Sequence, residues 1–291
     1  MDTNNFFSFQ RIAMVMKREL MENWKKNLYA FIGIYAAFLI VMVVQMGNAS
    51  GTPGDELSYK IYCNGYVKVF TLVALFLSFI NASSIMEGMQ TKEQRISFLM
   101  LPATMIEKFV ARFLYVTVGL IVAILVAISL AELTRLMLMP LFNLPEMYHK
   151  TVLPDVFWMM FVEDDKVMCI EGDQYSWMGE LCGWCWLLWA HSLYILGGNY
   201  WYKKPFFKTL GIIILVLLVG SFAMIHIVDW VGADTWMNIG NWLEEHTGWV
   251  TLAHLYSFGI AFFSAFTLFN WWLSYKLFTR AQVVKPKFRL L

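Results

Sequence analysis

The sequence predicts an all-α, polytopic membrane protein with six transmembrane helices. An amphipathic interfacial helix precedes the first span, and a short cytoplasmic helix lies between spans 2 and 3. Three observations predict this fold class. Hydrophobic residues make up 59% of the 291 residues and charged residues 15%, whereas roughly 25% of a typical soluble protein is charged. Several apolar runs reach the ~20 residues that a helix needs to cross a bilayer. Lys and Arg gather in alternate connections between these runs.

Residues 1–27 are polar and charged and lack the apolar core of a cleavable signal peptide. The first span is therefore expected to act as its own insertion signal. Apolar residues recur at helical spacing here, at Phe9, Ala13, Met16, Leu20 and Trp24. Cations fill the other sides, at Arg11, Lys17, Arg18, Lys25 and Lys26. This pattern predicts a helix that lies in the membrane interface with its cations near anionic headgroups. A solvated N-terminal helix is the alternative.

Six segments have the length of membrane spans, and none carries an acidic or basic residue at its centre. They are Leu28–Met46, Val69–Met86, Phe113–Ala131, Leu181–Asn199, Thr209–Val228 and Val250–Leu273. The fourth differs from the others because it is rich in tryptophan and contains a histidine and two cysteines.

The distribution of cations predicts the orientation of the spans. Seventeen of the 22 Lys and Arg residues lie in the N-terminal stretch, the loop between spans 2 and 3, the loop between spans 4 and 5, and the C-terminal tail. Because cytoplasmic loops carry the excess of Lys and Arg, both termini are expected in the cytoplasm.

The longest external segment, residues 132–180, is acidic and is divided by three prolines. At under fifty residues it is too short to form a well-packed domain of its own. We expect it to pack on the ends of the spans. The chain 1–291 is therefore expected to form a single transmembrane domain.

The cytoplasmic loop 87–108 holds two helix-start signals. Thr91 with Gln94, and Thr104 with Glu107, have the spacing of capping boxes, in which side chains satisfy the unpaired amides of a first turn. Pro102 disfavours helical geometry in the preceding residue and ends the first of the two helices. Within that helix Ile96, Leu99 and Met100 share one predicted apolar edge. An ordinary cytoplasmic loop with ordinary caps is the alternative.

The end of this loop resembles the ABC-2 type permeases of ABC transporters. The matching residues are Leu101, Pro102, Ala103, Thr104, Glu107, Lys108 and Arg112. The resemblance implies a membrane subunit that moves an unidentified substrate with ATP hydrolysed by a separate subunit. It also implies a structural role for Leu101, Pro102, Thr104, Glu107, Lys108 and Arg112, and an elbow-like helix before the first span. Residues expected to couple to the ATPase are Glu87, Gln90, Thr91, Lys92, Glu93, Gln94 and Arg95.

The partners that the resemblance implies are a cytoplasmic ABC ATPase, which would bind ATP and Mg, and a second permease subunit in a homo- or heterodimer. The location it implies is a bacterial plasma (inner) membrane. No Gly-x-x-x-x-Gly-Lys-[Ser/Thr] phosphate loop occurs in the sequence, so ATP is expected on the partner and this chain is not expected to be an enzyme. No cofactor or metal is expected, and no region is basic enough to predict nucleic-acid binding.

Cysteines and histidines offer further candidate chemistry. Cys182 and Cys185 form a Cys-x-x-Cys, which elsewhere signals redox or metal chemistry but here lacks a second pair. Cys63 and Cys169 both fall in external segments, where an oxidising exterior allows a disulfide that spacing alone does not decide. His191, His226 and His254 lie in or near spans 4, 5 and 6, either as one shared polar site or as separate interhelical contacts.

Two other functions compete with transport. The first is a membrane subunit of the same shape whose ATP-driven movement signals or confers resistance without carrying a solute. The second is an intramembrane enzyme that uses the three span histidines. Activity in the chain alone favours the enzyme, and ATP hydrolysis without solute movement favours the non-transporting subunit.

Overall fold

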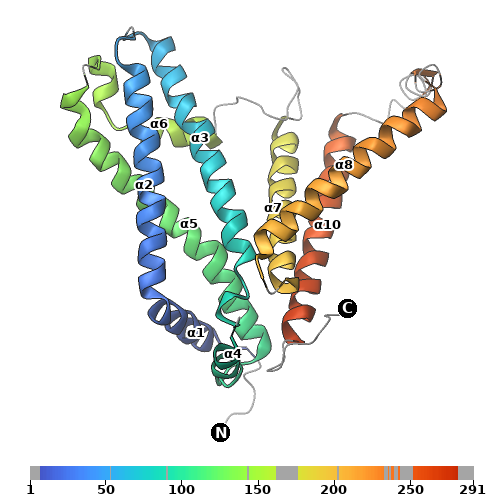
Figure 1. Ribbon diagram of the computed structural model, residues 1–291. Coiled ribbons are helices and arrows are strands. Elements are labelled where there is room, and N and C mark those ends of the chain that lie inside the picture. Colours follow the sequence, from blue (N-terminus) through green and yellow to red (C-terminus); the bar gives the residue numbers. More distant parts are fainter. Residues whose placement is uncertain are drawn as a thin grey trace. The chain divides into compact units, whose positions relative to one another are not determined.

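We describe the fold from a computed structural model of the chain (Figure 1). The structure describes residues 7–52, 54–89, 91–142, 144–161, 176–201, 203–232, 235, 237–238, 242 and 252–280. Within these ranges all regular secondary structure is helical, which confirms the all-α prediction. Internal contacts divide the chain into two compact units. One comprises Met1–Asn81 with Met100–Asp165, and the other Ala82–Leu99 with Lys166–Leu291.

The first unit is built on three long helices and one short one that precedes them. Its helices are α1 (Phe9–Glu22), α2 (Trp24–Ala49), α3 (Glu56–Ser83, apart from its last two residues), α5 (Met105–Leu138), η2 (Met139–Leu141), η3 (Glu146–His149) and α6 (Leu153–Phe161). Helices α2 and α3 run antiparallel: Phe38 packs edge-on against Phe70 at 5.1 Å, and the Tyr66 hydroxyl donates to the Met42 carbonyl. Side chains of α2, α3, α5, η3 and α6 share one hydrophobic core.

The second unit is built on α7 (Ser176–Tyr200), α8 (Pro205–Val231) and α10 (Leu252–Thr279), with η1 (Glu87–Met89) and α4 (Lys92–Leu99). Helices α7 and α10 run in the same direction. A Cβ on Gly259 would meet Cys182 near the start of both helices, and further along Asn270 donates to Ser192. The start of α8 packs against the last turns of α7, where Tyr194 stacks on Phe206.

Four helices are long and apolar enough to cross a membrane within the described residues. They are α2, α3 with its short extension to Met89, α5 with its extension to Leu141, and α8. The chain is therefore an integral membrane protein by length and composition. Helices α7 and α10 coincide with predicted spans 4 and 6 but are not among these four helices. Their assignment as spans stays a prediction.

Helix α3 begins well before the second predicted span. That span was expected at Val69–Met86, whereas α3 begins at Glu56 and ends at Ser83, with its short extension reaching Met89. The early start is helical because Tyr59, Tyr62 and Tyr66 recur on one side of α3 and are buried there. Packing thus extends this helix well beyond its apolar run.

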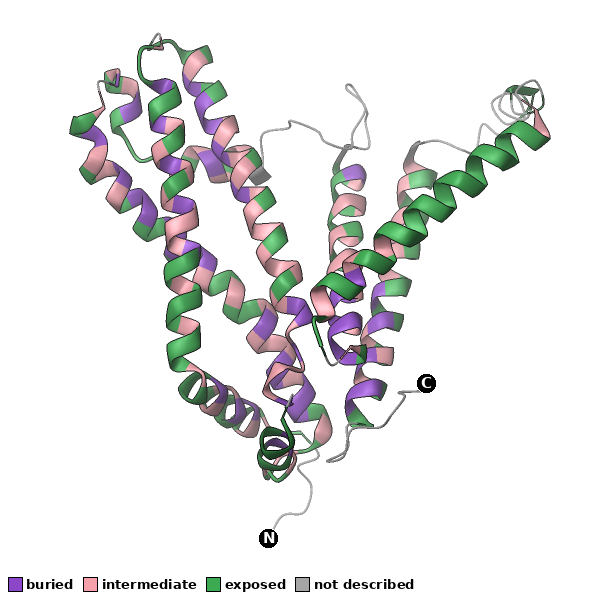
Figure 2. Cartoon of the chain, in the orientation of Figure 1, coloured by how far each residue is buried: buried purple, intermediate pink, exposed green. Residues whose placement is uncertain are grey.

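Helix α8 is exposed on all sides. Almost every residue from Gly211 to Trp230 is exposed, as Figure 2 shows along the length of this helix. Its contact with α7 is confined to its start, where a Cβ on Gly197 would overlap Thr209. A helix that is apolar all round and not packed in protein is typical of one surrounded by lipid.

Candidate functional site

The two predicted capping boxes both form. In the first, the Gln94 amide N–H donates to the Thr91 hydroxyl and the Thr91 amide N–H donates to the Gln94 side chain, each at 3.2 Å. In the second, Thr104 and Glu107 exchange the same pair of bonds at the start of α5. Helix α4 ends at Leu99, before the predicted break at Pro102. Gln90, a predicted partner-binding residue, lies outside the described residues.

Helix α4 is attached to its unit through its buried side. Phe98 is 3% exposed and packs edge-on against Phe278 of α10 at 6.1 Å. Lys92, Glu93 and Gln94 are exposed, and Thr91 before them is exposed as well. The helix therefore has a packed side that faces α10 and a charged side open to solvent.

The predicted apolar edge of α4 is not its buried side. Ile96 is 36% exposed, and Met100, directly after the helix, is 78% exposed. Burial falls instead on Phe98 and on Arg95, which lies three residues before it. The open side of α4 thus combines an aliphatic side chain with charges, which is the composition of many protein-binding surfaces.

Arg95 does not belong to the open side. It is 5% exposed, and within the described part of the chain its Nε and Nη1 atoms are buried without a hydrogen-bond partner. Burying an unpaired charge costs several kcal/mol in principle. Direct contact of Arg95 with a partner stays a prediction, and the burial of its side chain in this conformation does not favour it. Glu93, by contrast, is fully exposed, and hydrogen bonds from its own backbone amide and then from the Thr91 hydroxyl lower its pKa.

The connection from α3 to α4 is held against α7. A Cβ on Gly198 would lie 2.5 Å from the Ser83 carbonyl oxygen, so the backbones approach closely where α7 carries this glycine. Ile85 is fully buried in the same place, and Glu87 in η1 is half-buried. The candidate partner-binding stretch is thus fixed to α7 at its beginning and to α10 through Phe98.

Glu107 lies at the centre of a polar site in the first unit. Its side chain is fully buried and accepts hydrogen bonds from the amides of Ser8 and Thr104, at 2.7 and 2.8 Å. Arg11 donates to the same carboxylate through Nε and Nη2. A single acid therefore stabilises the starts of both α1 and α5.

A second buried ion pair lies beside this site. Nη2 of Arg112 is 2.8 Å from the carboxylate of Glu19, and both side chains are less than 10% exposed. Lys108 is 3% exposed, and the Tyr115 hydroxyl donates to Asn27 at 2.6 Å. Glu107, Lys108 and Arg112 thus face the protein interior. Of the remaining motif residues, Pro102 and Thr104 are exposed, and Leu101 and Ala103 are half-buried.

Helix α1 has the two sides that an interfacial helix needs. Ile12, Val15 and Glu19 are buried, and Glu19 is paired with Arg112 of α5. Of the predicted apolar face, Phe9 and Leu20 are exposed, by 79% and 50%. This apolar side is uncovered within the described residues, and its position in the lipid interface stays a prediction.

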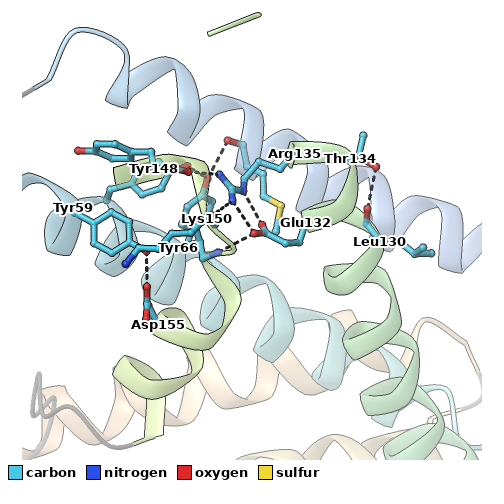
Figure 3. A network of polar contacts seen from close by, with 12 residues as sticks. Tyr59, Tyr66, Leu130, Glu132, Thr134, Arg135, Tyr148, Lys150 and Asp155 are labelled. Carbon is cyan, nitrogen blue, oxygen red and sulfur yellow. Dashed lines mark hydrogen bonds and ion pairs between the residues drawn. The ribbon is translucent and has the colours of Figure 1, made fainter. Parts of the chain in front are cut away.

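The segment 132–180, which is predicted to be external, contains another polar cluster (Figure 3). Glu132 and Arg135 in α5 form a buried pair at 2.7 Å, and Arg135 also donates to the carbonyls of Tyr148 and Lys150. The Val152 amide donates to Glu132 at 2.9 Å. The pair therefore fixes the chain that returns after α5, and the described part of the segment packs on the membrane helices, as its length predicted.

Aromatic side chains surround this cluster. Tyr148 packs edge-on against Tyr59 and Tyr62 at 5.6 and 4.9 Å, and the Tyr59 hydroxyl donates to Asp155 (Figure 3). Glu132 and Arg135 satisfy one another and the neighbouring backbone. The cluster thus holds α3, α5 and the segment that follows α5 against one another.

The cysteines and histidines do not assemble a reactive centre among the described residues. Cys63, Cys182 and Cys185 are free thiols, and Cys169 lies outside the described ranges. His191 is half-buried in α7, whereas His226 in α8 and His254 in α10 are exposed. No group of three or more His, Cys, Asp or Glu side chains suited to a metal occurs in the part of the chain that the structure describes.

The residues missed by sequence reasoning are the long-range partners Arg11 and Glu19. Glu19 had a weak signal, because it is an acid among many cations in residues 1–27.

Comparison of the chain with models of protein families, with curated proteins and with solved structures finds no match.

Proposed function

We propose that this protein is the membrane subunit of an ATP-driven transporter of the ABC-2 type, and that a separate cytoplasmic ATPase supplies the energy. The observation that carries the proposal is the two-sided character of α4. One side packs on α10 through Phe98, and the other presents Lys92, Glu93 and Ile96 to solvent. A capped helix with one packed side and one open side has a surface for a partner and an attachment that transmits movement to the rest of the chain.

The attachments of α4 suggest how movement passes to the membrane helices. A partner that pulls on its open side displaces Phe98 against Phe278, and therefore acts on the end of α10. The close contact of Ser83 with Gly198 carries the same displacement to α7. Small displacements are transmitted well here because packed interiors are dense and have little freedom to absorb them.

The proposal assigns α7 and α10 as spans 4 and 6. Their parallel direction agrees with an odd number of crossings between them, and α8 supplies one that runs the other way. The ends of α7 and α10 then lie with α4 in the cytoplasm, together with both termini. The cation distribution supports the same orientation. A second copy of the chain, or a related subunit, completes the translocation path in this proposal.

The decisive experiment is purification of the affinity-tagged chain from its native membrane in mild detergent. We expect a cytoplasmic ATPase to co-purify, and the complex in vesicles to hydrolyse ATP and move a solute. Robust hydrolysis without movement of any tested solute would favour the non-transporting subunit. An enzymatic activity in the chain alone, with no ATPase bound, would contradict the proposal.

A further inference from the structure

We infer that the end of α10 binds the headgroup of an anionic phospholipid. Trp272, Lys276 and Arg280 are spaced four residues apart and therefore follow one side of the helix. Together with Leu273 and Leu277 they line a shallow pocket at this end of the second unit. The inference does not depend on the proposed function.

The ammonium group of Lys276 is held in a defined position. Its Nζ lies 3.9 Å from the centre of the Trp272 ring, so the side chain runs back along the helix. A cation over the face of an indole ring is attracted by the ring electrons. Tryptophan side chains concentrate at the level of lipid headgroups, and Lys276 is thereby placed where phosphate groups lie.

Capping of the helix end does not account for these cations. The Lys276 carbonyl already accepts hydrogen bonds from the Thr279 hydroxyl, at 2.9 Å, and from the Arg280 amide, at 3.3 Å. Lys276 points away from the last carbonyls of α10, because it covers Trp272. Its charge is therefore available to a ligand that lies beside the helix.

The start of α8 repeats the arrangement in the same unit. Lys208 lies 4.9 Å from the centre of the Trp201 ring, and Lys203 and Lys204 precede the helix. Because α8 begins where α7 ends and α7 is parallel to α10, both tryptophan–lysine pairs lie at one end of the unit. The exposed cations there outnumber the acids of α4 and η1, which favours an anionic surface as the ligand.

The pocket fits a phospholipid better than a free phosphate. Leu273 supplies a partly exposed apolar wall beside the two cations, whereas Leu277, which also borders the pocket, is 2% exposed and packs into the protein. A phosphate would contact the cations only, whereas a lipid would also cover the wall with its acyl chain. The ligand class is therefore an anionic glycerophospholipid with its headgroup at Lys276 and Arg280.

The test is a lipid titration of the delipidated protein, followed by native mass spectrometry. Each Lys or Arg beside an anionic surface contributes roughly a fivefold change in affinity, so Lys276→Gln with Arg280→Gln should weaken phosphatidylglycerol binding about thirtyfold. Phosphatidylcholine binding should not change. The matched control is Lys60→Gln with Lys68→Gln, which removes two exposed cations of α3 and should retain wild-type binding.

Three results would overturn the inference. They are equal affinity of the wild-type protein for both lipids, unchanged phosphatidylglycerol binding by the double variant, and displacement of the lipid by excess inorganic phosphate. A second measurement covers a variant that fails to fold. A photoactivatable phosphatidylglycerol should crosslink the wild-type chain between residues 272 and 280, and labelling confined to other segments would contradict the site.

Discussion

Arg11 and Glu107 form an ion pair between α1 and the first turn of α5, with 2.7 Å between Nη2 of Arg11 and Oε1 of Glu107. Nε of Arg11 donates to the same carboxylate, and such bidentate pairs are among the stronger hydrogen-bonded contacts in proteins. Glu107 also caps α5 together with Thr104. The position of α1 therefore depends on how α5 begins.

Replacement of Glu107 with Gln should loosen α1 from α5. The amide keeps the volume of the acid but leaves Arg11 without its counter-charge, at a cost of about 2 kcal/mol. Thermal unfolding in one detergent should show a clear fall in Tm. The control is Arg18→Gln, which breaks the exposed pair with Glu22 and should cost no more than about 0.5 kcal/mol. Equal losses in the two variants would contradict the role of Glu107.

The buried pair of Glu19 with Arg112 should behave as a unit. Arg112→Met alone leaves the carboxylate of Glu19 buried without its cation, and we expect a loss of about 3–5 kcal/mol. The double change Glu19→Leu with Arg112→Met removes both charges and should recover most of that loss. The stabilities of the wild type, the single variant and the double variant are compared through their unfolding midpoints in SDS, which circular dichroism monitors. A double variant that is no more stable than Arg112→Met would show that the two charges are independent.

The features that sequence reasoning predicted correctly are local or compositional. Both capping boxes depend on two residues three positions apart, and that spacing is sufficient to place their side chains beside one another. The apolar runs that became α2, α5 and α8 were also readable, because a membrane span requires little more than length and hydropathy.

The features that it missed depend on packing between distant segments. Arg11 and Glu107 are 96 residues apart, and no local pattern links them. The early start of α3 depends on Tyr148, which returns from the external segment to cover Tyr59 and Tyr62. Arg95 was read as a surface residue because of its charge, whereas burial on α4 is decided by packing within the second unit, such as that of Phe98 on Phe278.

Cysteine labelling should test the predicted orientation. In a background without native cysteines, Thr151→Cys lies in the segment predicted to be external and should react with an impermeant maleimide in intact cells. Lys203→Cys lies between α7 and α8 and should react only after the membrane is permeabilised. Both native residues are exposed, so folding should not hide either thiol. Reaction of both positions from the outside would end the six-span topology.

Replacement of Arg95 with Met should stabilise the isolated chain or leave its stability unchanged. The Nε and Nη1 atoms of Arg95 are buried without a partner in the described part of the chain. A methionine of similar length removes the desolvated charge and keeps contact with its neighbours. Thermal unfolding of the purified chain measures the difference. A fall of several kcal/mol in stability would show that the guanidinium has a partner.

The open side of α4 should be needed for partner binding and not for folding. Glu93→Lys with Ile96→Ser changes one exposed charge and one exposed apolar side chain. Surface substitutions usually alter stability by no more than about 0.5 kcal/mol, so expression, insertion and Tm should stay at wild-type values. At an interface, like charges brought together can cost several kcal/mol, and each ~1.4 kcal/mol lowers affinity tenfold. We therefore expect the ATPase to be lost when the tagged variant is purified.

A matched control separates loss of a surface from loss of charge in general. Glu56→Lys with Leu57→Ser makes the same two kinds of change at exposed positions, the first of them 78% exposed, at the start of α3. In the predicted topology that site lies across the membrane from α4, so the control should retain the ATPase. Because Phe98 still anchors α4 to α10 in the test variant, a loss of ATPase at unchanged Tm is assignable to the open side. Wild-type recovery of the ATPase by the α4 variant, or equal loss in the control, would remove α4 as the partner-binding surface.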